Sequence, residues 1–371
     1  MSEIPIVYMQ DHAGPGGAQQ SLLGILKNLN RNRYKPYLIC GEKGYLTEQA
    51  EKLDVEVKII PFPSWRKFKD RFKRLGFINQ LIKAFEGFNA QLVHSNEHWF
   101  GPFAAEACSA RGIPSVCHVR DAVVIPRKVN QYLFHKQSAI IIISQAVGEH
   151  LIQHPSTTNL IETVHNGVDC TRFNYHLNGD SVREEWGVNS QEYLIGCAGK
   201  LCERKSQLDI MEACVRLFLK YPHVKLALVG PTDLEYRKIL EDFARETDIS
   251  GKVIFSGPRM DMPQVLSAFD CFVLPSKREG LPRSVLEALA MRKPVIASNI
   301  PSTSEIITNH KTGLLYNLGV TSELSEALET YINNPKLAVE MAQNGLDLVA
   351  KQFTLEKCQE KIETIYEKFL N

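Results

Sequence analysis

The chain alternates short apolar segments with longer helical segments, and this alternation occurs as two separate series. In the first series, strands are expected at Ile4–Met9, Pro36–Cys40, Val55–Ile60, Leu92–Ser95, Ser115–Val119, Ala139–Ile143 and Ile161–Val164. In the second series, they are expected at Tyr193–Cys197, Lys225–Val229, Val253–Phe255, Cys271–Leu274 and Pro294–Ala297. Strands separated by helices are typical of parallel sheets that are covered by helices. The sequence therefore predicts an α/β protein with two doubly wound, Rossmann-like sheets.

A polar stretch without strong periodicity, residues 170–190, separates the two series. A chain of 371 residues is also too long for one ordinary core. We therefore expect an N-terminal domain over residues 1–175 and a second domain over residues 176–352. The end of the chain, residues 353–371, has the pattern of an amphipathic helix.

Composition narrows the class of protein. Hydrophobic residues make up 44% of the chain and charged residues 23%, as in soluble globular proteins. A formal net charge of +1 gives no sign of nucleic-acid binding. The chain has no run of about 18 apolar residues and begins without a signal peptide, and its nine cysteines include no C-x-x-C pair. These features predict a cytoplasmic protein with reduced thiols, no structural metal site and no nucleic-acid partner.

The most informative segment is residues 275–290, which follow an expected buried strand. Gly280 permits a tight turn, and Pro282 suits the first position of a helix. Glu279 then lies on a strand-to-helix loop, and Glu287 lies about two turns into the helix. Free amides at the helix start bind anions, and a nearby carboxylate can accept hydrogen bonds from the vicinal hydroxyls of a sugar. The segment therefore indicates a nucleotide or nucleotide-sugar site, although an arbitrary pair of glutamates is more often a pair of solvated surface charges.

The same segment resembles the E-x7-E signature of retaining, nucleotide-sugar-dependent glycosyltransferases of family 4, which have the two-domain GT-B fold. The matching residues are Glu279, Gly280, Leu281, Pro282, Glu287, Ala288 and Ala290. The resemblance implies two Rossmann-like domains that face each other across a cleft, with the last helix crossing back to the N-terminal domain. It also implies that Gly280, Leu281 and Pro282 line the donor site, that Glu287 binds the ribose hydroxyls, and that Glu279 binds the hydroxyls of the transferred sugar.

Three cations, Lys200, Arg204 and Lys205, lie within six residues after the glycine that ends the first strand of the second series. Lone loop lysines are usually solvated, but this cluster indicates a clamp for a diphosphate. The segment is similar to the family pattern G-R-L-x-x-x-K-G. Lys205 matches the lysine of that pattern, whereas Lys200 replaces its arginine and loses the bidentate fork. The resemblance implies that both lysines bind the donor phosphates.

Two segments of the first series are also candidates. Gly16 and Gly17 follow the first strand, where glycines let a backbone approach a ligand, although a simple tight turn is an equal alternative. The loop is similar to the family's N-terminal G-G loop, but Gln19 stands where many members have Glu. His118 ends a strand, and on the residue alone a structural histidine is favoured. The resemblance implies that His118 contacts the transferred sugar, and it leaves Arg120 for a phosphate or an acceptor.

The segment Trp65–Phe77 carries six basic residues and one acidic residue. Phe68, Phe72 and Leu75 recur at helical spacing within it. A basic amphipathic helix with aromatic residues suits an anionic membrane surface, and a solvated helix with ordinary core contacts is the alternative. Related enzymes that modify lipids often attach through such a stretch, so we expect a cytoplasmic protein that is peripheral at the inner face of a membrane.

These segments together predict a retaining glycosyltransferase of cell-envelope polysaccharide, lipopolysaccharide or glycolipid synthesis. Its partners would be a nucleotide-sugar donor and a saccharide or lipid-linked acceptor. By resemblance, the leaving phosphate helps to deprotonate the acceptor, and no cofactor or metal ion is required. One alternative is a nucleotide-sugar epimerase or a phosphorylase on the same fold, and the other is a non-catalytic nucleotide-sugar-binding protein. Release of nucleoside diphosphate only with acceptor present would argue against the first, and the intact set of Glu279, Glu287, Lys205 and His118 argues against the second.

Overall fold

The structure is a computed structural model that describes residues 3–65, 71–121, 129–154 and 160–370. Their contacts divide the chain into two compact units. Unit 1 comprises residues 1–167 and 355–371, and unit 2 comprises residues 168–354. The boundary therefore lies before the expected position at 175. Val168 is the reason, because its amide donates to the carbonyl of Phe353, and Phe173 just after it is buried.

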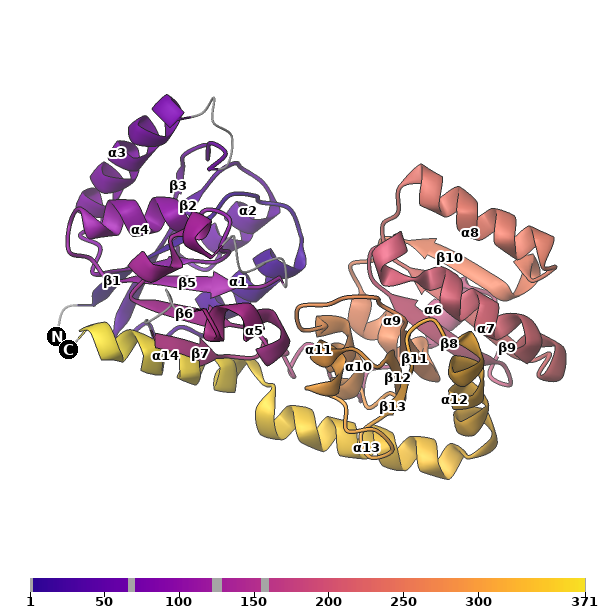
Figure 1. Ribbon diagram of the computed structural model, residues 1–371. Helices are drawn as coiled ribbons and strands as arrows, with labels where there is room; N and C mark the ends of the chain where they lie inside the picture. Colours follow the sequence, from indigo (N-terminus) through magenta and orange to yellow (C-terminus); the bar gives the residue numbers. More distant parts are fainter. Residues whose placement is uncertain (1–2, 66–70, 122–128, 155–159, 371) are drawn as a thin grey trace. The chain divides into compact units, whose positions relative to one another are not determined.

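Unit 1 contains a sheet of seven parallel strands in the order β3-β2-β1-β4-β5-β6-β7. The strands are β1 (Ile4–Gln10), β2 (Tyr34–Cys40), β3 (Glu56–Ile59), β4 (Leu92–Ser95), β5 (Ser115–Val119), β6 (Ala139–Ile142) and β7 (Leu160–Thr163). The helices are α1 (Gly17–Asn28), α2 (Tyr45–Glu51), α3 (Arg71–Gly87), α4 (Gly101–Ser109), α5 (Gln145–Ile152) and α14 (Leu355–Leu370). Figure 1 shows α14, in yellow, beside the strands of this unit.

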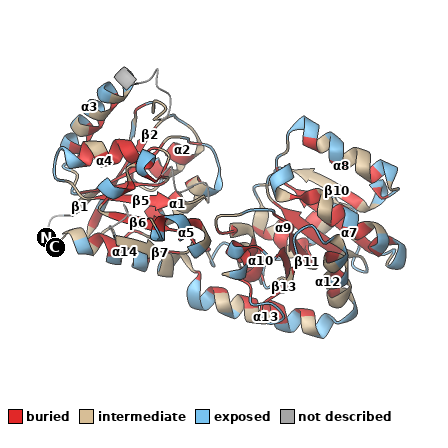
Figure 2. Ribbon diagram, viewed as in Figure 1, coloured by how far each residue is buried: buried red, intermediate tan, exposed pale blue. Residues whose placement is uncertain are grey.

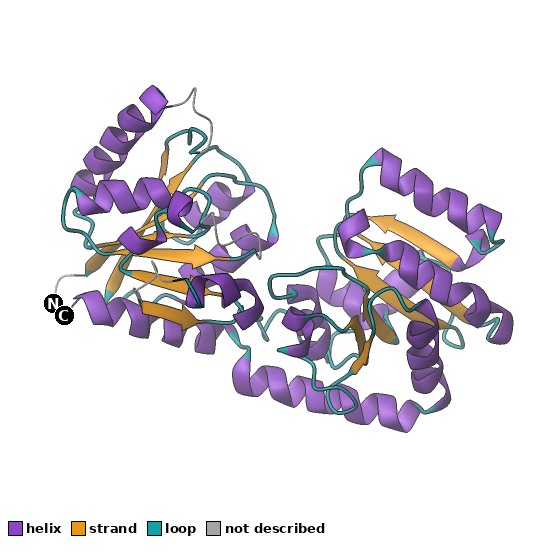
Figure 3. Cartoon of the chain, in the orientation of Figure 1, coloured by secondary structure: helices purple, strands orange, loops and turns teal. Residues whose placement is uncertain are grey.

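Unit 2 contains a sheet of six parallel strands in the order β10-β9-β8-β11-β12-β13. The strands are β8 (Tyr193–Ala198), β9 (Val224–Val229), β10 (Val253–Gly257), β11 (Cys271–Leu274), β12 (Val295–Ser298) and β13 (Leu314–Tyr316). The helices are α6 (Asp180–Glu185), α7 (Gln207–Lys220), α8 (Leu234–Glu246), α9 (Met262–Ala268), α10 (Arg283–Ala290), α11 (Pro301–Ser304), α12 (Thr321–Asn333) and α13 (Pro335–Gln352). In each unit the strands lie inside and the helices outside (Figure 3).

The predicted doubly wound α/β class is confirmed, and all expected strands are present with ends within two residues of the expected ones. Strand β13 was not expected, because its three residues are too few to show a pattern. The strand order has the same consequence in both sheets. The winding direction reverses between β1 and β4 in unit 1, and between β8 and β11 in unit 2. Open parallel sheets bind ligands at the carboxyl ends of the strands where this reversal occurs.

The first strand shows why these sheets need helices on both faces. Side chains alternate across a strand, so Ile6 and Tyr8 pack on one face of the unit 1 sheet, and Val7 and Met9 pack on the other. Helices α1, α2 and α14 supply the apolar side chains for the first face, and α3 and α4 supply those for the second. Buried residues accordingly concentrate on the strands and on the inner sides of the helices (Figure 2).

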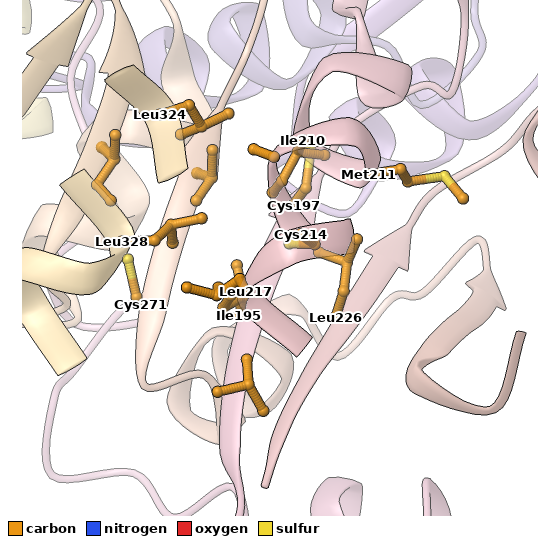
Figure 4. Packing of buried hydrophobic residues seen from close by; sticks show 14 of the residues in the cluster. Ile195, Cys197, Ile210, Met211, Cys214, Leu217, Leu226, Cys271, Leu324 and Leu328 are labelled. Carbon is orange, nitrogen blue, oxygen red and sulfur yellow. The ribbon is translucent and has the colours of Figure 1, made fainter. Parts of the chain in front are cut away.

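One face of the unit 2 sheet is covered by α7 and α12 (Figure 4). The residues labelled there are Ile195, Cys197, Leu226 and Cys271 from the strands, Ile210, Met211, Cys214 and Leu217 from α7, and Leu324 and Leu328 from α12. The cysteines in this cluster are free and buried, as expected of reduced thiols that behave as small apolar side chains.

Helix α14 packs into unit 1 through Ile362, Ile365 and Tyr366. We predict that Ile362→Ala lowers the free energy of unfolding of unit 1 by about 2–5 kcal/mol, because the substitution leaves a cavity in a closed core. Peptide-resolved hydrogen exchange during urea titration measures this for each unit. Protection of β1 and β4 should fall, whereas protection of β8 and β11 should not.

The exposed Lys361→Ala on the same helix is the matched control and should leave both units unchanged. Equal loss of protection in β8 and β11 would contradict the assignment of α14 to unit 1.

Candidate functional site

The loops after β8 and β11 meet at the strand-order reversal of unit 2, because these two strands are hydrogen-bonded neighbours. Lys205 lies in the first loop and Glu279 in the second. Lys205 Nζ is 2.6 Å from Glu279 Oε1, and the two side chains are only 14% and 9% exposed. Two predicted site residues that are far apart in the sequence thus form a nearly buried ion pair.

Arg204 ties the same two loops together. Its Nη1 donates to the carbonyl of Arg278 at 2.7 Å and lies 3.5 Å from Glu279 Oε2. Its own carbonyl accepts from the amide of Lys277 at 2.9 Å. Glu279 therefore lies against two cations, and two hydrogen bonds with Arg204 fix the position of the segment just before it.

Two glycines let the main chain pass close by at the carboxyl ends of β8 and β9. Gly199 has a φ of +148° and Gly230 a φ of +141°. A Cβ on Gly230 would lie 2.0 Å from the carbonyl oxygen of Gly199, so no other residue fits there without a shift of the backbone. A Cβ on Gly199 would reach within 3.8 Å of Lys205 Nζ. Beside Lys205, the site is therefore lined by main chain that carries no side chain at Gly199.

Helix α10 follows the Glu279 loop and begins at Arg283, with Pro282 at its N-cap. Leu281 is buried and anchors the turn. Glu287 lies one turn after Arg283, with its Oε1 3.3 Å from Arg283 Nη2. Burial raises the pKa of Glu287, and the nearby guanidinium groups of Arg283 and Arg172 oppose that shift. Glu287 is thus a mostly buried carboxyl that pairs with Arg283 of its own helix and also feels the charge of Arg172.

Lys200 differs from Lys205. Its side chain is exposed, and no ion pair joins it to a carboxylate within the described part of the chain. Its carbonyl accepts from the side chain of Gln207, which fixes the loop backbone. The structure therefore brings Lys205 and Glu279 together and leaves Lys200 on the surface.

In unit 1, His118 lies on β5 next to β4, the strand at the order reversal, and is 1% exposed. Arg120 follows it and binds its surroundings with every nitrogen of the guanidinium. Nε and Nη2 donate to Asn96, Nη1 donates to Asn166 Oδ1, and Nη2 also lies 3.1 Å from His118 Nδ1. Arg120 therefore acts as a scaffold that holds His118, and its expected contact with a phosphate or an acceptor stays a prediction.

His118 and Arg120 line a small pocket of unit 1 with Ser21 of α1, Asn166, and Gln359 of α14. Burial lowers the pKa of His118, and the adjacent charge of Arg120 and the neighbouring His94 lower it further. Burial and Arg120 also lower the pKa of His94 to about 3. Both imidazoles are therefore neutral at physiological pH.

Gly16 and Gly17 lie at the start of α1. A Cβ on Gly16 would lie 2.5 Å from Gln19 Oε1, and the Gln19 amide donates to the carbonyl of His12. The Gln19 side chain therefore packs against the inner side of this loop, in space that a side chain on Gly16 would fill. A Cβ on Gly17 would meet no atom within 4 Å, so this side of the loop is open.

The motifs did not identify His94, Tyr366 or Arg204 as site residues. Arg204 was noted only as part of the cation cluster. His94 lies one residue before the end of β4, beside β5, and that position was the one available signal. Tyr366 contacts His94 from a helix at the other end of the chain, so no local pattern could find it.

Two family descriptions cover most of the chain. Residues 15–172 match Glycosyltransferase Family 4, and residues 179–347 match glycosyl transferases group 1. The chain belongs to glycosyltransferase family 4. This family-4 enzyme carries the Glu279 and Lys205 segments inside the second matched range.

Relatives of the enzyme agree with this assignment. It is 24% identical over 380 residues to an Escherichia coli protein named UDP-Gal:alpha-D-GlcNAc-diphosphoundecaprenol alpha-1,3-galactosyltransferase, covering 98% of this chain and 97% of the relative. It is also 24% identical over 247 residues to the lipopolysaccharide core mannosyltransferase LpsB of Rhizobium meliloti, covering 65% and 68%. The enzyme is thus similar along its whole length to a glycosyltransferase.

Solved structures give the same fold. Anabaena HepE in complex with UDP has a TM-score of 0.86 at 21% identity, covering 98% of this chain and all of the other. A glycosyltransferase from Rickettsia africae has a TM-score of 0.89 at 20% identity, with both chains fully covered. The predicted GT-B fold is confirmed. Among the described residues, no helix is both long and apolar enough to cross a bilayer.

The buried histidines predict a specific pH dependence of stability. The folded-state pKa values of His118 and His94 lie below the ordinary value of 6.5. As the pH falls below 6.5, the unfolded chain binds protons that the folded chain does not, so unit 1 loses stability. The loss is up to about 1.4 kcal/mol per pH unit for each histidine.

In His118→Gln, the free energy of unfolding of unit 1 should therefore fall less steeply between pH 6 and pH 4.5. The difference in slope should correspond to the uptake of about one proton. The same peptide-resolved hydrogen exchange measures it in unit 1. Identical slopes in the parent and the variant would show that His118 titrates normally in the folded state.

Proposed function

We propose that this family-4 enzyme transfers a sugar with retention of configuration from a nucleotide-sugar donor to a hydroxyl of a saccharide or lipid-linked acceptor. The observation that carries this proposal is the Lys205–Glu279 ion pair at the strand-order reversal of unit 2. An ammonium group placed there suits the charge of a diphosphate leaving group, and a carboxylate placed there can accept hydrogen bonds from the hydroxyls of a sugar.

The ion pair suggests how the donor binds. When the diphosphate arrives, its oxygens replace Glu279 as the partner of Lys205, because a diphosphate carries more negative charge than one carboxylate. Glu279 then accepts hydrogen bonds from the sugar hydroxyls. In the transfer step, Lys205 stabilises the charge that develops on the leaving phosphate, which is usually the largest single contribution to catalysis.

Other residues complete the donor site in this proposal. Glu287 accepts from the ribose hydroxyls, and the backbone amides of Gly280, Leu281 and the start of α10 bind phosphate oxygens, with Pro282 setting the helix start. The exposed Lys200 contributes long-range attraction. His118 contacts the transferred sugar, and the loop of Gly16 and Gly17 faces the donor with its open side at Gly17. We propose that these cations and amides perform the role of a metal ion, so transfer should proceed in excess EDTA.

The acceptor class is proposed from the relatives. The similar E. coli protein is named for transfer to a diphosphoundecaprenol-linked sugar, and LpsB is named for lipopolysaccharide core synthesis. We therefore propose that the enzyme acts in cell-envelope polysaccharide synthesis on the cytoplasmic side of the membrane.

The direct test is a transfer assay in EDTA with a panel of nucleotide sugars, with and without lipid-linked or free saccharide acceptors. Two results together support the proposal. Nucleoside diphosphate is released only when acceptor is present, and the new glycosidic bond has the same anomeric configuration as the donor. Phosphate-dependent release of sugar phosphate would show a phosphorylase instead, and an altered sugar without release would show an epimerase. Binding of a nucleotide sugar without any turnover would indicate a non-catalytic binding protein.

Glu287→Ala should weaken binding of the nucleoside diphosphate by about 1.5–3 kcal/mol, which corresponds to about 10- to 150-fold in Kd. The reason is the loss of a charged acceptor for the ribose hydroxyls. Titration calorimetry on the whole chain measures the change.

Glu241→Ala is the matched control, because Glu241 also pairs with an arginine four residues earlier, Arg237, but lies on α8. Its Kd should equal that of the parent. Unchanged affinity in Glu287→Ala would remove Glu287 from the ribose site.

We also propose a peripheral contact of the segment Trp65–Phe77 with anionic lipid, and the structure narrows which residues can make it. Trp65 Nε1 donates to the carbonyl of Gln131, and its ring packs edge-on against Phe103. Phe77 is buried. Leu75 is 63% exposed and Lys73 is exposed. Both aromatic ends of the segment therefore pack into unit 1, and the proposed contact depends on its middle, of which residues 66–70 lie outside the described residues.

A flotation assay tests this contact. The parent should float with vesicles that contain anionic lipid and not with neutral vesicles, because the attraction is largely electrostatic. Replacement of Arg66, Lys67, Arg71 and Lys73 by serine should abolish flotation. Replacement of four exposed lysines elsewhere, Lys238, Lys311, Lys336 and Lys361, is the charge-matched control and should retain it. A parent that never floats would contradict the membrane contact.

A further inference from the structure

Four buried aromatic side chains form a continuous chain of polar contacts through unit 1, from Tyr8 to Tyr366, His94 and His118. The hydroxyl oxygens of Tyr8 and Tyr366 are 3.3 Å apart, and Tyr366 Oη lies 2.5 Å from His94 Nδ1. His94 Nε2 lies 3.3 Å from His118 Nδ1. All four side chains are at most 1% exposed. Each shared proton must therefore be placed within the chain itself, since solvent does not reach it.

Arg120 decides where these protons lie. Its guanidinium always donates, and Nη2 is 3.1 Å from His118 Nδ1. His118 Nδ1 must therefore be the acceptor nitrogen, because a proton on it would point at another donor. The proton of the neutral His118 imidazole then lies on Nε2.

The rest of the order follows. His94 Nε2 lies 3.3 Å from the same unprotonated His118 Nδ1, and two unprotonated nitrogens at this distance would repel each other, so His94 carries its proton on Nε2. His94 Nδ1 then accepts from Tyr366, whose single hydroxyl proton is used in this short contact. Tyr8 Oη lies 3.3 Å from the Tyr366 oxygen and extends the contacts beyond it. The donated protons thus run in one consistent direction from Tyr366 towards His118.

His118 Nε2 is buried and has no hydrogen-bond partner among the described residues. A buried N–H without a partner is costly, and such groups are rare unless a ligand satisfies them. This nitrogen is the free end of the chain of donors.

We propose that His94 and Tyr366 are positioning residues that, with Arg120, hold His118 as a neutral imidazole with its proton on Nε2. His118 is then a hydrogen-bond donor to an oxygen of the transferred sugar, and its Nδ1 does not take a proton from the acceptor because its one lone pair faces the guanidinium of Arg120. This role of the donated bond rests on the proposed function, whereas the order of protons does not. Through Tyr366, helix α14 becomes part of the site, although it follows unit 2 in the sequence.

Burial supports the neutral state. It lowers the pKa of both histidines, and the charge of Arg120 acts in the same direction. A neutral imidazole has one donor and one acceptor nitrogen, which is the condition that the chain requires.

The first experiment is a two-bond ¹H–¹⁵N correlation spectrum of the ¹⁵N-histidine-labelled whole chain at pH 7.5 without ligand. His118→Gln and His94→Gln assign the two histidines. The expected spectrum shows both as neutral imidazoles protonated on Nε2. A His118 signal with the Nδ1–H pattern, or a protonated imidazolium, would overturn the proposal whether or not the enzyme transfers sugar.

The second experiment compares Tyr366→Phe with Tyr34→Phe. The ring of Tyr34 packs edge-on against Tyr366, but its buried hydroxyl has no hydrogen-bond partner among the described residues, so it is a matched control. Tyr366→Phe should shift the His94 Nδ1 resonance and lower kcat/KM for the donor by about 3- to 10-fold, the range for one lost hydrogen bond. Tyr34→Phe should leave both unchanged. An unchanged His94 resonance and kcat/KM in Tyr366→Phe would remove Tyr366 from the site.

The two experiments separate the possible failures. If no nucleotide sugar is turned over by the parent, the proposed function fails, and the ligand-free spectrum still decides the order of protons. If Tyr366→Phe does not fold, the parent spectrum alone decides it.

Discussion

The reversal of strand order in each sheet is the constraint on which the functional residues depend. In a parallel sheet, the loops at the carboxyl ends of two adjacent strands diverge where the winding changes direction, and ligands bind there. In unit 2 the reversal brings the loops of Lys205 and Glu279 together. In unit 1 His94 lies on β4, which borders the reversal, and His118 lies on β5, the next strand of the sheet. The strand order therefore sets where the candidate site residues of this family-4 enzyme lie.

The Lys205–Glu279 ion pair has consequences for both stability and binding. Removing one partner of a buried pair leaves an uncompensated charge, which typically costs about 3–5 kcal/mol. Substitution of Lys205 or Glu279 would thus mix a loss of stability with a loss of function, whereas Glu287 is better suited to a binding test. Arg204, held by the carbonyl of Arg278, keeps a second cation beside Glu279 and stabilises the pair. In the proposed function, a donor diphosphate replaces Glu279 as the anionic partner of Lys205.

Much of the fold could be predicted from the sequence because buried parallel strands appear in it as continuous runs of apolar residues. Strand β13 could not be predicted, because three residues are too few to show a pattern. The boundary at Gly167 could not be predicted either, because it depends on a hydrogen bond from Val168 to Phe353. The segments of Glu279 and Lys205 could be recognised because each is local. Their ion pair, the scaffold role of Arg120 and the contact of Tyr366 with His94 join distant parts of the chain, and no local pattern contains them.

The central claim is that a donor diphosphate takes the place of Glu279 beside Lys205. A crystal structure of the whole enzyme with the nucleotide sugar that it turns over tests this most directly. The account predicts Lys205 Nζ within hydrogen-bond distance of a phosphate oxygen and Glu279 accepting from a sugar hydroxyl. A bound donor with the Lys205–Glu279 ion pair still intact, or a donor bound away from the loops after β8 and β11, would contradict it.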